Sequence, residues 1–167
     1  MILCYRGTSL ISRLIELRTW SCYSHTSWMC SNGSEFEAWP GKGVVHAAMW
    51  GENHTPVTQI DCFDFVQPLS PDEIQDMEAY LIMQVGKHYD YSGVFGFLPI
   101  ARLFGLHNNS KAFFCSELIA AATQYINRPL SRKATWRIDP DDVAMSPVLK
   151  FVKTIKVRDD SLQIALA

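Results

Sequence analysis

Residues 24–39 read SHTSWMCSNGSEFEAW, two short runs of strand-forming residues joined by an Asn-Gly turn signal. β-Branched and aromatic residues are typical of strands, and an Asn-Gly pair between two such runs predicts a β-hairpin. His25 lies in the first run and Glu37 in the second. The way in which the hairpin closes therefore decides whether these two side chains can meet.

Two closures of this hairpin remain open at the level of the sequence. A two-residue Asn-Gly turn places Glu37 on the face of the sheet opposite His25, because a one-residue slip reverses the faces of a strand. A three-residue loop over 31–33, with Gly33 in the left-handed region, pairs Ser27 with Glu37 instead. Glu37 is then the diagonal same-face neighbour of His25, roughly 7 Å away at the backbone. Only this second register brings the carboxylate to the imidazole.

The sequence around the hairpin predicts an α+β domain. Further strands are expected at 2–5, 43–50, 57–66 and 149–157, where apolar runs are bounded by Gly, Pro and Asn. Helices are expected at 8–19, 71–85, 91–106 (with a break near Pro99) and 114–126, with a short one opening at Asp139-Pro140-Asp141-Asp142. The 167 residues leave room for a single domain spanning 1–167. This order of elements predicts an antiparallel sheet packed against helices.

Composition and charge exclude several classes of protein. Apolar residues make up 48% of the chain and charged residues 19%, which is typical of a folded domain and not of a disordered one. The net charge of −2 argues against a protein that binds nucleic acid through phosphate contacts. No apolar run reaches the ~18 residues of a transmembrane segment. Arg6, Arg13, Glu16 and Arg18 interrupt the apolar N-terminus, so we expect no Sec signal and a chain that is cytoplasmic as synthesised.

The five cysteines are odd in number and irregularly spaced, which favours a reduced compartment and mostly buried thiols over a disulfide framework. They are Cys4, Cys22, Cys30, Cys62 and Cys115. The spacing Cys22-x-x-His25-x4-Cys30 offers three metal-ligand types. Strand alternation places the last two on opposite faces, however, and no Cys-x-x-Cys pair supports zinc. We therefore expect no zinc site at this pattern, with a metal-binding module as the alternative.

Cys115 lies in FFCSELIAAATQYI, residues 113–126, where the helix begins at the thiol or just before it. Unpaired N–H groups and the helix macrodipole at such a position favour the thiolate and lower the pKa of the thiol. The same N–H groups can receive an oxyanion. Cys115 is therefore a candidate nucleophile, and the alternative is a small buried side chain of a core helix.

A thiol nucleophile needs a base, and five histidines are available. His25 is the best placed, in a strand of small and apolar residues. His46 lies in an apolar strand and is expected to be a core histidine. His54 is expected in a turn, and His88 and His107 are expected to be exposed at loop or helix ends.

These motifs, taken in order, resemble the circularly permuted NlpC-type papain-like cysteine hydrolases, in which the histidine strand precedes the cysteine helix. The resemblance runs from Gly7 to about Ser146. It rests on Ser-His in a strand, on Glu-Ala about a dozen residues later, on Gly-x-x-Tyr-Asp within 86–91, on Cys-Ser-Glu-Leu opening a helix, and on the Pro-Asp-Asp helix start at 140–142. It implies a papain-like fold without a metal or cofactor.

Residue by residue, the resemblance implies Cys115 as the nucleophile, His25 as the general base and Glu37 as the group that orients the imidazole. Tyr89 stands where family members often carry a tyrosine near the oxyanion site. Family members cleave peptide amides of the bacterial cell wall, and permuted relatives include lipid-directed hydrolases and acyltransferases. The resemblance therefore implies a cell-wall peptidase, with an acyl-lipid hydrolase or acyltransferase and a catalytically silent peptide or lipid binder as alternatives.

Two further segments bear on the substrate and on delivery. The stretch VFGFLPIARLFGL, residues 94–106, is either a core helix or an apolar wall suited to an acyl chain. Basic residues near the C-terminus form either a solvated strand edge or a docking site for an anionic polymer or lipid surface. They are Lys150, Lys153, Lys156 and Arg158. A wall hydrolase without an export signal would be a phage lysis or tail module, or an injected effector with an immunity or delivery partner.

Overall fold

A six-stranded sheet forms the centre of the structure, a computed structural model that describes residues 1–7, 21–56, 58–91 and 112–157. Its strands lie in the order β4-β3-β2-β1-β5-β8, and every neighbouring pair is antiparallel. The bounds are β1 (Ile2–Arg6), β2 (His25–Met29), β3 (Glu35–Trp39), β4 (Gly43–Ala47), β5 (Gln59–Phe65) and β8 (Leu149–Lys156). The histidine strand β2 is thus an interior strand of the sheet.

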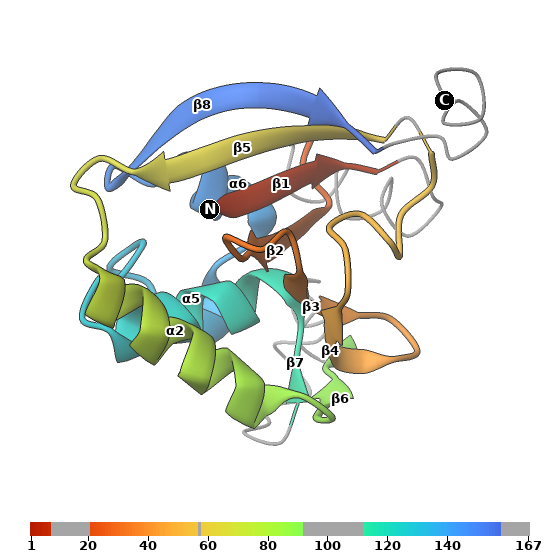
Figure 1. Cartoon of the computed structure of the whole chain (residues 1–167), viewed down its shortest axis with the longest axis horizontal. Coiled ribbons are helices and arrows are strands. Elements are labelled where there is room, and N and C mark those ends of the chain that lie inside the picture. The colour runs from red at the N-terminus through yellow and green to blue at the C-terminus, as the bar shows by residue number, and fades with distance from the viewer. Residues whose placement is uncertain (8–20, 57, 92–111, 158–167) are drawn as a thin grey trace, which may run out of the picture.

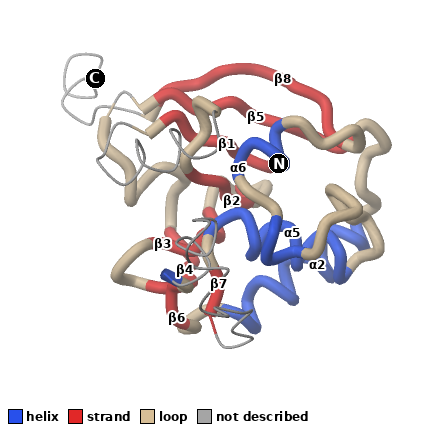
Figure 2. The backbone as a smooth tube through the Cα atoms, turned by 180° about the vertical axis from the view of Figure 1, so that it is seen from behind, coloured by secondary structure: helices blue, strands red, loops and turns tan. Residues whose placement is uncertain are grey.

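The described helices are α2 (Pro71–Gln84), α5 (Cys115–Tyr125) and α6 (Pro140–Ala144), with a short 3-10 helix at Thr135–Arg137. Helix α5 packs against β2 and β3, and α2 covers the side of α5 that faces away from the sheet (Figure 1). Helix α6 lies against β1, β2 and α5, as the view from behind shows (Figure 2). The α+β class expected from the sequence is therefore confirmed.

Local sequence signals set the helix starts. Ser70 caps α2, because its hydroxyl accepts from Glu73 N at 3.2 Å while Glu73 Oε2 accepts from Ser70 N at 2.8 Å. Asp139 caps α6 in the same reciprocal way with Asp142. Both helices have proline in the first turn, where its missing N–H costs nothing.

The hairpin between β2 and β3 closes through the three-residue loop. Met29 pairs with Glu35, Cys30 N donates to Ser34 O at 2.9 Å, and Gly33 has φ of 86°. Glycine reaches this left-handed region without the steric cost of a Cβ. The second of the two registers is therefore the one adopted, and it puts Glu37 on the same face as His25.

The chain after α2 returns to the edge of β4. Val44 N donates to Lys87 O at 2.8 Å, and Gly86 N donates to Val44 O at 2.9 Å. A Cβ on Gly43 would lie 2.1 Å from Lys87 O, so only glycine permits this approach. Beyond it, β6 (His88–Tyr89) forms a short parallel pair with β7 (Ala112–Phe113), which leads directly into α5. The sequence did not predict this pair.

Strand β8 forms the other edge of the sheet and is largely exposed. The lysines at 150, 153 and 156 are all exposed on it. The register between β5 and β8 shifts by one residue at Cys62/Phe63. Arg158, most of the segment expected to be helical at 91–106, and the helix expected at 8–19 lie outside the described residues.

All five cysteines are free, with Cys22 exposed and the other four buried, and the expectation of mostly buried thiols is confirmed. His88 is exposed, as expected, and His107 lies outside the described residues. Within the described parts of the chain, none of the helices is long and apolar enough to cross a membrane.

Candidate active site

Cys115 is the first residue of α5, and its side chain is buried against β2. The preceding residue, Phe114, makes no side-chain cap, so its side chain does not occupy the N–H groups at the helix start. Burial opposes the thiolate. The charge and hydrogen bond of His25 outweigh it, together with backbone hydrogen bonds from Thr26 and Ser116, and the pKa of Cys115 is lowered. The thiol is therefore held in an environment that activates it.

His25 lies between this thiol and Glu37. Its Nε2 is 2.7 Å from Glu37 Oε2, and its side chain also hydrogen-bonds to Cys115. The rings of Tyr5 and Trp39 pack edge-on against the imidazole, with centroids at 5.4 and 5.3 Å. Burial opposes the imidazolium, but Cys115 and Glu37 outweigh burial and raise the pKa of His25 to about 10. The lowered pKa of Cys115 and the raised pKa of His25 both favour the thiolate–imidazolium form of this pair.

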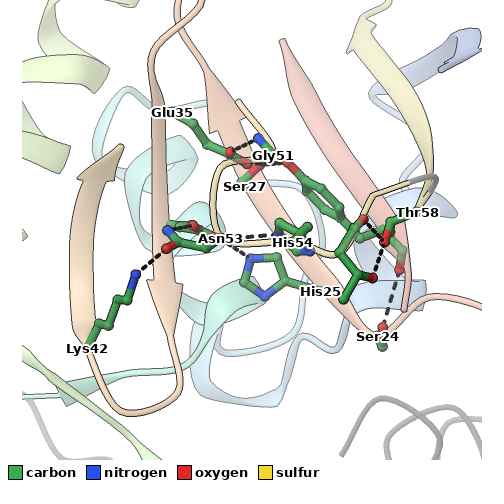
Figure 3. A network of polar contacts seen from close by, with 12 residues as sticks. Ser24, His25, Ser27, Glu35, Lys42, Gly51, Asn53, His54 and Thr58 are labelled. Atoms are coloured by element: carbon green, nitrogen blue, oxygen red, sulfur yellow. Dashed lines mark hydrogen bonds and ion pairs between the residues drawn. The ribbon is translucent and has the colours of Figure 1, made fainter. Parts of the chain in front are cut away.

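Glu37 is completely buried, yet it has a polar contact on each carboxylate oxygen. Oε2 faces His25, and Oε1 accepts from Asn53 Nδ2 at 2.6 Å (Figure 3). Lys42 in turn donates to Asn53 Oδ1, which fixes the orientation of the amide. Burial opposes ionisation, but His25 and His54 outweigh it and hold the pKa of Glu37 below its usual value. Glu37 is a charged group aimed at the imidazole.

The loop that carries Asn53 and His54 is tied to the sheet by Glu35. Gly51 N donates to Glu35 Oε2 at 2.7 Å, and the hydroxyl of Tyr5 donates to the other oxygen of the same carboxylate. The ring of Tyr5 also stacks on His54, with centroids 3.8 Å apart and planes inclined by 7°. The Glu35 carboxylate therefore brings a distant turn back onto the site.

Tyr89 in β6 is buried and lies close enough to Cys115 for the charge of the thiolate to act on it. Burial raises the pKa of the Tyr89 hydroxyl well above its usual value, and the charge of Cys115 adds to this. Tyr89 pairs with Phe113, two residues before Cys115. The parallel pair of β6 and β7 is what places this tyrosine beside the start of α5.

The structure thus brings together Cys115, His25 and Glu37, with Tyr89 nearby. Asn53 and His54 were not predicted as site residues, because both lie in a turn and the hydrophobic pattern carries no signal for where a turn folds back. The polar run Glu52-Asn53-His54, a few residues after β4, was the available hint.

The expectation of a buried core histidine at position 46 is wrong. His46 is exposed and stacks on Phe36 with centroids 4.0 Å apart, and its Nε2 lies 2.9 Å from the Ser34 hydroxyl. It lies on an edge strand, where it covers the phenylalanine ring and leaves its own ring open to solvent.

One group of side chains in the described residues has the spacing of a metal site, namely His25, Glu37 and His54. Their ligand atoms lie within 4.8 Å of one another. The cysteines of the Cys22-x-x-His25-x4-Cys30 pattern are not part of this group.

Comparison with known proteins supports the fold, and the chemistry of the site is argued from the residues of this chain. No family model matches the sequence, and no curated protein matches it. Among solved structures, the chain is similar to the metalloprotein yiiX from Escherichia coli O157:H7, which carries the designation DUF1105. The TM-score is 0.64 at 19% identity, and the match covers 95% of this chain and 96% of the other. The whole described architecture therefore recurs in a solved structure of similar length.

Proposed function

We propose that this protein is a cysteine hydrolase of the circularly permuted papain-like type, which cleaves an amide bond through a Cys115-His25-Glu37 triad. The observation that carries the proposal is the placement of one buried imidazole between a helix-start thiol and a buried carboxylate. A nucleophile, a base and a group that orients the base are the parts required for covalent acyl transfer.

Each residue has a defined part in this reaction. The Cys115 thiolate attacks the substrate carbonyl, and the N–H groups at the start of α5 stabilise the oxyanion. The His25 imidazolium then donates its proton to the leaving amine and afterwards activates the water that hydrolyses the thioester. Glu37 holds the ring in position and stabilises its charge, and Tyr89 contributes to the oxyanion or substrate side of the site.

The first candidate substrate is the stem peptide of peptidoglycan, and the alternative is an acyl bond of a lipid. The support for both is the resemblance of the sequence to permuted NlpC-type enzymes, some of which act on wall peptides and others on lipids. A protein with this activity would be kept from its own cell wall by compartment or by an immunity partner, and would act as a phage-borne or injected enzyme.

Digestion of purified peptidoglycan and of phospholipid vesicles, each followed by mass spectrometry of the products, tests the proposal. The wild type should release new amino groups from peptidoglycan or fatty acid from the vesicles, and Cys115→Ala should reduce this release to background. Glu37→Gln should retain more activity, with a loss on the order of 10²-fold, because it removes the charge that orients the base but keeps the base itself.

The pattern of results distinguishes the alternatives. Cleavage of stem peptides supports a peptidase, whereas fatty-acid release supports the lipid enzyme. Binding of either substrate without turnover would mean a silent binding module. Undiminished activity in Cys115→Ala would refute the thiol mechanism for both substrates.

A further inference from the structure

The side chain of His54 is buried beside the triad, and its Nε2 faces Glu37 without forming a hydrogen bond. The side chain is 6% exposed, and Nε2 lies 3.4 Å from Glu37 Oε2. Buried polar atoms in proteins nearly always have a partner, so an orphaned one at a cluster of polar groups points to a missing ligand. The ring is held in this orientation by its stack on Tyr5.

We propose that His25 Nε2, Glu37 Oε2 and His54 Nε2 form a binding site for a divalent transition metal of the zinc type, and that an ion bound there arrests the thiol chemistry. Each of the three residues offers one ligand atom within 4.8 Å of those of the other two, and both Nε2 atoms lie next to Glu37 Oε2, at 2.7 and 3.4 Å. Two imidazoles and a carboxylate are a ligand set that zinc uses in enzymes. The effect on the thiol chemistry rests on the proposed hydrolase function, whereas the metal site itself does not.

The spacing of the donors fits an ion of this size. Zinc lies about 2.0–2.2 Å from nitrogen and oxygen ligands, so tetrahedral donors lie roughly 3.3 Å apart. His54 Nε2 and Glu37 Oε2 are already 3.4 Å apart. His25 Nε2 and Glu37 Oε2 lie 2.7 Å apart and must separate by about half an ångström when a metal ion replaces the shared proton.

The surrounding groups support the ligands as outer-shell partners do in metal sites. Asn53 Nδ2 donates to Glu37 Oε1 at 2.6 Å, which leaves Oε2 as the oxygen facing both imidazoles. Figure 3 shows His25 and His54 side by side next to the Asn53 amide. Hydrogen bonds of this kind orient metal-ligating carboxylates and raise metal affinity.

A metal ion here would act on catalysis through His25. Coordination at Nε2 sends the proton of that nitrogen to solvent and leaves a neutral imidazole that carries hydrogen only on Nδ1. Such a ring has no lone pair to accept a proton and is a far weaker acid than imidazolium. The acid–base cycle required for turnover therefore stops, while Cys115 itself keeps its place and its hydrogen bond.

Zinc binding measured by equilibrium dialysis and calorimetry tests the site, with the Cys115→Ala protein as host so that the nucleophile cannot be a ligand. We expect one zinc per chain, and we expect His54→Phe to weaken binding by more than the ~10–100-fold that loss of an outer-shell partner costs. Phenylalanine keeps the aromatic stack on Tyr5 and removes only the nitrogen. His54→Gln is the second variant, in case the first does not fold.

The outcomes separate the two proposals. Absence of zinc binding at micromolar concentrations, or binding in both His54 variants as tight as in the Cys115→Ala host, would overturn the metal site whatever the enzyme does. Zinc bound at one per chain with loss in the His54 variants establishes it even if no substrate is ever cleaved. In the wild type with an intact thiol, zinc should suppress hydrolysis, and EDTA should restore it. Hydrolysis that continues with the site loaded would overturn the proposed arrest.

Discussion

The alkylation rate of Cys115 reports directly on the pair it forms with His25. We consider the replacement His25→Gln, which removes the imidazole but keeps an amide that can donate to the buried Glu37 carboxylate. His25→Ala is a useful companion, although it leaves that carboxylate without its partner at 2.7 Å. In both variants we expect the pKa of Cys115 to rise, because the charge and hydrogen bond that oppose burial are lost.

The size of the effect follows from the thiolate fraction. An ordinary thiol with a pKa of about 8.5 is about 1% thiolate at pH 6.5. A fully ionised thiol therefore has a thiolate fraction about 100-fold higher. Thiolates of lower pKa are intrinsically weaker nucleophiles, which reduces the gain in rate to about tenfold. Because burial alone raises the pKa of a thiol, tenfold is a lower bound for the difference between wild type and variant.

The dependence on pH has a definite sign. His25 stays protonated until the pH approaches about 10, so the wild-type rate should stay level through the neutral range. In the variant the rate should rise about tenfold per pH unit, as it does for a thiol below its pKa. Iodoacetamide labelling followed by peptide mass spectrometry resolves Cys115 from the other thiols. The exposed Cys22 is the internal reference, since its rate should be the same in both proteins. Superimposable profiles for Cys115 in wild type and variant would refute the pair.

Gly43→Ala should destabilise the fold by about 2–5 kcal/mol in urea unfolding, because a Cβ at φ of 80° would lie 2.1 Å from Lys87 O. Gly41→Ala is its control, because Gly41 has φ of 83° and nothing within 4 Å of a Cβ. This variant should lose only about 1–2 kcal/mol of unfolding free energy. Equal losses at both positions would contradict the close approach of Gly43 to Lys87. Burial and Asp90 raise the pKa of Glu117 to about 7, so its contribution to stability falls as the pH rises from about 4.5 through 7. Glu117→Gln should therefore raise the free energy of unfolding by about 1–3 kcal/mol at pH 8 and leave it nearly unchanged at pH 4.5, whereas a gain that is the same at both pH values would rule out titration as its cause.

The fold was accessible from the sequence wherever a local rule decides the structure. The reciprocal caps at Ser70 and Asp139 and the helix start at Cys115 are encoded within a few residues, and the structure has all three helices where the sequence predicts them. The register of the hairpin between β2 and β3 was harder to predict. The Asn-Gly pair is compatible with two registers, and only the three-residue loop, with Gly33 left-handed, puts Glu37 beside His25.

The rest of the site could not be predicted because it depends on contacts between distant segments. Asn53 reaches Glu37 only because Glu35 accepts from Gly51 N and so draws the turn over the sheet. His54 adopts its orientation by stacking on Tyr5, which is 49 positions earlier in the chain. Such tertiary contacts leave no periodic trace in the sequence, and a turn histidine looks the same whether it faces solvent or a buried carboxylate.

The exposed edge strand β8 has a consequence for how this protein behaves at high concentration. An eight-residue edge with Phe151 and Val152 exposed is a template on which a strand of another chain could pair. The register shift at Cys62/Phe63 puts Lys150 and Lys153 on one face of the strand and Lys156 on the other, so an incoming strand meets an ammonium group on either side. These lysines act as gatekeepers against fibril-like association. Acetylation of these lysines removes their charges without changing Cys115, His25 or Glu37, and should allow β8 of one chain to pair with an edge strand of another.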